Sequence, residues 1–199
     1  MSEGGDSLGA LLDRRPLLLV LAGPTGAGTS TFFHTHLSTL GLRFINADLL
    51  GRELDLDARQ AMAVADGLRA ELIRQRESFI TETVFSDPVG AKLEVFTSAM
   101  AQGYTVVLLY IGVSSAERSD ERVAMRVLQG GYDVPPDRII ARFPRCLVNL
   151  RSALIRISAV LVYDNDDLSR PYRLVARTEE GSIVFQTDAL PEWLTELLT

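Results

Sequence analysis

The chain carries at residues 23–31 the stretch Gly23-Pro24-Thr25-Gly26-Ala27-Gly28-Thr29-Ser30-Thr31. Its spacing matches the phosphate-binding pattern G-x-x-x-x-G-K-[ST], in which glycines let backbone N–H groups curl around phosphates. Gly23, Gly28 and Ser30 fit this pattern, whereas Thr29 stands where a lysine would bridge two phosphates. The stretch therefore predicts a phosphate site that lacks its usual positive charge.

The flanking segments favour this interpretation over an ordinary glycine-rich turn. Residues 16–22 form a short apolar run that suits a buried parallel strand. Residues 30–40 can continue as a helix whose N-terminus faces the loop, which is where anions bind. Strand, loop and helix thus follow in the order that a phosphate site requires.

The composition and net charge of the chain limit the classes of protein to which it can belong. The chain has 199 residues, is 47% hydrophobic and carries a formal net charge of −6, which favours one domain over residues 1–199 and argues against a nucleic-acid partner. No apolar run is long enough to span a membrane, and residues 1–15 lack a signal-peptide pattern, so we expect a cytoplasmic protein. Residues 1–10 are expected to be flexible. Lys92 is the only lysine beside 19 arginines, a bias that warns against treating every arginine as a phosphate ligand.

Apolar runs alternate with helical segments in the manner of a parallel α/β fold. Strands are expected at residues 16–22, 43–46, 78–83, 104–112 and 159–163, and helices at 57–76, 89–101, 116–129 and from 135 onward. Pro88 is expected near the first turn of its helix, and Pro144 is expected to kink or interrupt the last of them. The C-terminal part predicts a β-hairpin, from 172–178 and 182–187, and a terminal helix from Pro191.

Carboxylates follow two of the expected strands, at the edge of the sheet where ligands bind. Asp48 comes just after residues 43–46 and is a candidate base for a hydroxyl proton, although it could equally cap the next segment. Glu82 interrupts an apolar and hydroxyl-bearing strand end. It is expected to meet Mg²⁺-bound water or substrate hydroxyls, or to face solvent.

Two arginine sets follow on helices. Arg122 and Arg126 are spaced i, i+4, and Arg142 and Arg145 lie on the next helix. Residues 116–156 are therefore predicted to form a helical lid whose guanidinium groups neutralise a transferring phosphoryl group, with Arg126 and Arg142 favoured for that role. Most of the other arginines are expected to be solvated.

Six strings taken together resemble the bacterial zeta toxin family in order and spacing. They are Leu21–Phe32, Phe44–Asp48, Phe79–Ser86, Arg122–Val127 with Gly130–Pro135, Arg142–Arg145 and Val162–Asn165. The resemblance implies a three-layer, nucleotide-kinase-like P-loop fold with a mainly parallel sheet. It also implies an ATP- or GTP-dependent, Mg²⁺-dependent kinase of UDP-N-acetylglucosamine and a small helical antitoxin as partner.

By position, the resemblance implies roles for single residues. Asp48 becomes the base, and Arg126 and Arg142 become the phosphate-stabilising arginines, with Arg145 an alternative to Arg142. Residues 23–31 hold the phosphates, Ser30 ligates Mg²⁺ and Asn165 lies near the adenine. The acceptor pocket is expected to comprise Asn46, Glu82, Thr83, Arg122 and Arg145.

Two positions depart from the family pattern: members commonly carry His where Tyr132 stands and Lys where Thr29 stands. Thr29 leaves three explanations open, namely a natural pseudoenzyme, a kinase compensated by a lid arginine, or a Lys-to-Thr change selected or engineered to disarm a toxin. We expect a phosphotransferase weakened at Thr29. The alternatives are an inactive nucleotide- or antitoxin-binding pseudokinase and a kinase of another small hydroxylated substrate.

Overall fold

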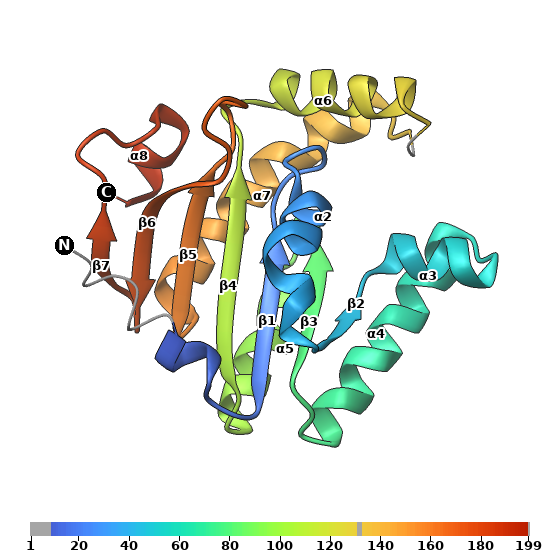
Figure 1. Ribbon diagram of the computed structural model, residues 1–199, viewed down its shortest axis with the longest axis vertical. Helices are drawn as coiled ribbons and strands as arrows, with labels where there is room; N and C mark the ends of the chain where they lie inside the picture. The colour runs from blue at the N-terminus through green and yellow to red at the C-terminus, as the bar shows by residue number, and fades with distance from the viewer. Residues whose placement is uncertain (1–8, 131–132, 199) are drawn as a thin grey trace.

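The computed structural model describes residues 9–130 and 133–198. Within those ranges seven strands form one sheet, in the order β2-β3-β1-β4-β5-β6-β7 (Figure 1). The first five strands run parallel: β1 (Leu17–Ala22), β2 (Arg43–Ile45), β3 (Phe79–Thr83), β4 (Thr105–Gly112) and β5 (Ala159–Asp164). The last two pair antiparallel: β6 (Arg173–Glu179) and β7 (Ser182–Gln186). The predicted α/β fold and C-terminal hairpin are confirmed.

Helices cover both faces of the sheet, which explains why β1 is apolar at every position. Leu18, Val20 and Ala22 face one apolar cluster, and Leu17, Leu19 and Leu21 face the other. The first cluster is packed by α4 (Ala58–Arg74), α5 (Ala91–Ala101), α7 (Pro136–Arg156) and α8 (Glu192–Leu198). The other is covered near the phosphate loop by α2 (Thr29–Phe32), and α6 (Ala116–Leu128) lies over the carboxyl ends of the central strands (Figure 1).

Several helix boundaries differ from the prediction. The helix after the loop is α-helical only over α2 and continues as a π-helical turn, Phe33–Leu37, and a 3-10 turn, Ser38–Leu40. Helix α5 begins at Ala91, because Gly90 has a left-handed φ of 70° and caps it, so Pro88 lies before the helix. Helix α3 (Ala47–Leu54) was not predicted at all.

Helix α7 runs unbroken through Pro144, so the predicted interruption is wrong, while the alternative of a kink stays a prediction. An internal proline removes one backbone hydrogen bond and costs about 3 kcal/mol. Phe143, Cys146 and Leu150 are buried on either side of it, and their packing keeps the helix continuous.

Some predictions fall outside the described residues: the flexible start, for residues 1–8, and the departure at Tyr132. None of the helices in the described ranges is long and apolar enough to cross a bilayer.

Candidate functional site

The loop between β1 and α2 needs its glycines for close packing. A Cβ on Gly23 would lie 2.3 Å from the Ile111 carbonyl oxygen, and one on Gly26 would lie 2.6 Å from that of Ser119. Gly28 caps α2 in a left-handed conformation, with φ 96°. The loop therefore adopts its tight curl directly beneath α6, as phosphate binding to backbone N–H groups requires.

Glu82, at the end of β3, accepts hydrogen bonds from three side chains around this loop. Thr29 Oγ1 donates to Glu82 Oε1 at 2.5 Å, and Ser30 Oγ lies 3.0 and 3.2 Å from the two carboxylate oxygens. Asn46 Nδ2 donates to Oε2 at 2.5 Å. The sequence singled out Glu82, but its bond to Thr29 was not foreseen. The hydroxyl that replaces the usual lysine is thus directed at a carboxylate.

Ser30 and Glu82 provide the type of oxygen ligands that Mg²⁺ takes. This ion is usually held by one or two carboxylates together with substrate phosphates and water. No group of three or more His, Cys, Asp or Glu side chains within residues 9–130 and 133–198 is arranged to hold a metal. Ser30 and Glu82 therefore fit a Mg²⁺ ion whose other ligands come from nucleotide phosphates and water.

Asp48 lies in the first turn of α3, at the carboxyl end of β2. The N-cap of α3 is Asn46, whose Oδ1 accepts from the Leu49 N–H at 3.0 Å, so the alternative of Asp48 as a helix cap is wrong. The Asp48 side chain is exposed. Asn46 links this turn to Glu82, which holds the candidate base near the loop.

The loop from β5 to β6 holds the phosphate loop from the other side. Asn165 Nδ2 donates to the Ala27 carbonyl at 2.8 Å, and the Tyr172 hydroxyl donates to that of Gly28 at 3.0 Å. The Tyr172 backbone N–H in turn donates to Asn165 Oδ1 at 3.2 Å. Asn165 therefore positions the phosphate loop directly, and its predicted place near an adenine stays a prediction. Tyr172 was missed, because nothing in the sequence links it to the loop.

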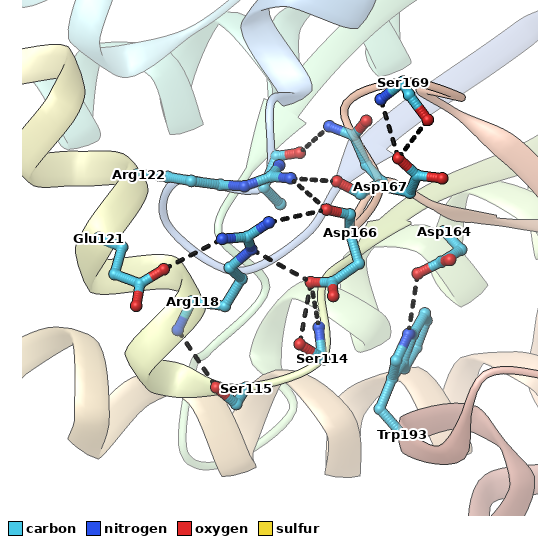
Figure 2. A network of polar contacts seen from close by, with 12 residues as sticks. Ser114, Ser115, Arg118, Glu121, Arg122, Asp164, Asp166, Asp167, Ser169 and Trp193 are labelled. Carbon is cyan, nitrogen blue, oxygen red and sulfur yellow. Dashed lines mark hydrogen bonds and ion pairs between the residues drawn. The ribbon is translucent and has the colours of Figure 1, made fainter.

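Arginines of α6 join that helix to the same segment (Figure 2). Arg122 Nη2 donates to the carbonyls of Asn165 and Asp166, and Arg118 Nη2 donates to that of Asp166 at 3.1 Å. Ser114 also donates to the Asp166 carboxylate. Burial, and next the neighbouring Arg118, lowers the pKa of Arg122. The structure thus places Arg122 between the phosphate loop and the segment that follows β5, and its predicted contact with the acceptor stays a prediction.

The other predicted arginines divide between two places. Arg126 lies one turn beyond Arg122, in the last turn of α6. Arg142 and Arg145 lie on α7 beside Cys146, whose Sγ donates to the Val84 carbonyl just after β3. Arg142 and Arg145 therefore lie on the part of α7 that packs against the end of β3, and the predicted phosphate contact of Arg126 stays a prediction.

Buried polar atoms at the contact of the loop with α6 fit a nucleotide. Thr25 Oγ1, Ser119 Oγ and Arg122 Nε are buried without a hydrogen-bond partner within the described part of the chain. Buried polar groups are normally hydrogen-bonded, because an unmet bond costs about 1–3 kcal/mol. A polyanion in the loop would supply acceptors for them.

The fold resembles several solved structures, one of which is from a toxin–antitoxin system. The AvrRxo1-ORF1:AvrRxo1-ORF2 complex with ATP matches with a TM-score of 0.72 at 16% identity, covering 98% of this chain and 66% of that chain. The PezAT chromosomal toxin–antitoxin system of Streptococcus pneumoniae matches with a TM-score of 0.55 at 14% identity, covering 97% and 82%. At such identities the likeness concerns the fold alone. The chain spans about two thirds of the length of its AvrRxo1 counterpart.

Sequence comparison gives the family. No curated protein matches the chain. The zeta toxin family model matches residues 55–174, a segment that includes Glu82 and the arginines of α6 and α7 but not the phosphate loop. Because this match covers more than half of the chain, the chain belongs to the zeta toxin family.

Proposed function

We propose that the chain is an ATP-dependent phosphotransferase of the zeta toxin type, which transfers a phosphoryl group to a hydroxyl of a sugar nucleotide. The observation that carries this proposal is the convergence on Glu82 of the loop hydroxyls and of Asn46, the cap of the helix that bears Asp48. The residues that would bind the donor phosphates and the residue that would act on the acceptor hydroxyl therefore lie at one edge of the sheet. UDP-N-acetylglucosamine is the acceptor that the family resemblance favours.

Each residue has a defined task in this reaction. Backbone N–H groups of residues 23–31 hold the phosphates of ATP, while Asn165 and Tyr172 fix the loop that presents them. Ser30 and Glu82 would hold Mg²⁺, which neutralises phosphate charge when bound. Asp48 accepts the proton of the attacking hydroxyl, since phosphoryl transfer needs little other covalent help from the protein. Arg126 stabilises the charge on the transferring group.

Thr29 limits the rate of this reaction. Its hydroxyl carries no charge and is bound to Glu82, so it donates nothing to the phosphates. Loss of one preorganised donor to the transition state costs roughly 100- to 1,000-fold in rate. ATP binding is less affected, because backbone N–H groups make most of the phosphate contacts.

The same contact supports a second candidate function, that of a nucleotide- or antitoxin-binding pseudokinase. A chain whose loop supplies no cation can still bind ATP. The solved AvrRxo1 complex with ATP and the PezAT toxin–antitoxin system make nucleotide and antitoxin the ligands to test.

Turnover separates the two functions. ATP-dependent phosphorylation of UDP-N-acetylglucosamine is measured for the chain, for Thr29→Lys and for Thr29→Lys with Asp48→Asn. A kinase gives product with Thr29→Lys and loses it when Asp48 is also changed. No product from any of the three, with ATP bound, would support the pseudokinase.

A further inference from the structure

The single lysine of the chain lies at the end of β3. Lys92 is the second residue of α5, and its Nζ donates to Thr83 Oγ1. Side chains alternate along a strand, so Thr83 faces away from Glu82, which bonds the phosphate-loop residues. Lys92 therefore lies across β3 from the phosphate loop, at the same edge of the sheet.

Two arginines from other helices approach the same place. Arg69, on α4, donates from Nε to Thr81 Oγ1 at 2.7 Å and is only 7% exposed. Thr81 and Thr83 share one face of β3, roughly 7 Å apart. Arg142, on α7, acts electrostatically on Lys92, and both of them act on the Cys146 thiol. Helices α4, α5 and α7 thus bring three cations together beside the strand end.

The neighbouring carboxylates do not balance these charges. Asp66 pairs with Arg69 at 2.5 Å, but its side chain is 63% exposed. Asp87 is the other carboxylate that acts on Lys92. Two carboxylates face three cations, so one positive charge remains in excess in a partly buried setting.

The direction in which the pKa of Lys92 is shifted agrees with this excess of positive charge. Burial chiefly, and then the charges of Arg69 and Arg142, lower the pKa of Lys92, while Asp87 and Asp66 oppose the effect. An ammonium group has three protons to donate, and the described residues accept one of them, at Thr83. A bound anion would accept the others and offset the repulsion among the cations.

We infer that Lys92, together with Arg69 and Arg142, forms an anion subsite that binds a phosphate or diphosphate group of the acceptor. A lysine ammonium group is a compact point charge that suits phosphate. The acceptor, rather than ATP, is its ligand because the subsite adjoins Glu82 but lies on the face of β3 turned away from the phosphate loop. This assignment to the acceptor rests on the proposed function.

The test uses Lys92 itself as the probe. Protein labelled with ¹³C-lysine gives one Cε resonance, because the chain has one lysine. Inorganic pyrophosphate should shift that resonance saturably and raise the pKa read from its pH titration. Potassium chloride at matched ionic strength should leave both unchanged. A resonance that pyrophosphate does not move, or that potassium chloride moves equally, would overturn the subsite.

Variants of the other cluster residues test which side chains contact the anion, while Lys92, the NMR probe, stays unchanged. Arg142→Gln should raise the pyrophosphate Kd at Lys92 at least 5-fold, while Arg59→Gln, which removes an exposed charge on α4, should change it less than 2-fold. Equal affinities in both variants would refute the subsite. Because this measurement needs no turnover, its failure is distinguishable from failure of phosphotransfer, which is measured with Thr29→Lys.

Discussion

The contact of Thr29 with Glu82 is the departure that most affects the chemistry of this chain. A lysine at position 29 would bring a cation between Glu82 and the phosphates. Threonine instead brings a neutral hydroxyl, and the carboxylate accepts it together with Ser30 and Asn46. The sequence predicted Glu82 and Ser30 as site residues from strand ends and loop spacing. It could not show that they bond each other, because that contact joins residues 52 positions apart.

The hydrogen bond of the Tyr172 hydroxyl leads to a prediction for this single residue. Tyr172→Phe removes the hydrogen bond to the Gly28 carbonyl, and such a bond contributes about 0.5–1.5 kcal/mol. If loop order supports nucleotide binding, the ATP Kd should rise roughly 2- to 10-fold. Isothermal titration calorimetry measures it. Tyr163→Phe is the matched control, since Tyr163 packs against Phe32 but donates to no loop carbonyl in the described chain. Equal ATP affinity in both variants would contradict the role given to Tyr172.

Among the elements, long and strongly patterned segments were predictable and short polar ones were not. The parallel strands are continuous apolar runs, and the hairpin has a clear turn at Glu180-Gly181, where both residues have positive φ. Helix α3 was missed because its eight residues bury no side chain fully and its signal is the Asn46 cap. Helix α7 continues through Pro144, because the packing of buried residues on both sides of it outweighs the one backbone hydrogen bond that a proline removes.

Cys146 tests the packing of α7 against the end of β3. Burial raises the pKa of its thiol to about 12, which Arg142 and its cationic neighbours only partly offset. At pH 8 this lowers the thiolate fraction about 1,000-fold relative to an ordinary thiol. Reaction with a disulfide reagent should therefore be slow in the native protein and fast in urea.

The raised pKa of Cys146 determines the direction in which the stability of the protein changes with pH. Folding raises this pKa, so the stability contributed by the neutral thiol is present below about pH 9 and is lost as the pH rises from about 9 towards 12. Cys146→Ala should remove that part of the alkaline loss of stability. Labelling of the native protein as fast as in urea would show that α7 does not cover the thiol.

At the scale of the whole molecule, the C-terminal segment packs on the sheet at the carboxyl ends of β4 and β5. Trp193 Nε1 donates to Asp164 Oδ1 at 3.1 Å (Figure 2), and its ring packs so closely on Gly112 that a Cβ there would lie 2.2 Å away. Asp164 also pairs with Arg173 at 3.3 Å. The terminal helix is thus joined to the strand end that leads into Asn165. The hydrogen bond and the ring packing of Trp193 therefore anchor the terminal helix to the ends of β4 and β5.

Trp193→Phe should lower the free energy of unfolding by about 1–3 kcal/mol, through the lost hydrogen bond and a partly filled space. Urea denaturation followed by circular dichroism measures the change. Phe185→Leu, at a 42% exposed position on β7, is the control and should stay within about 0.5 kcal/mol of the parent. Parent-like stability of Trp193→Phe would show that α8 is not held by this contact.

In the proposed function, one missing positive charge, at Thr29, separates this chain from an efficient kinase. The most direct test compares kcat and the ATP Kd between the chain and Thr29→Lys with UDP-N-acetylglucosamine as acceptor. We expect kcat to rise roughly 100- to 1,000-fold and the ATP Kd to change less than about 10-fold, because lysine acts on the transition state and the backbone holds the ground state. An unchanged kcat in Thr29→Lys, with ATP bound normally, would contradict it.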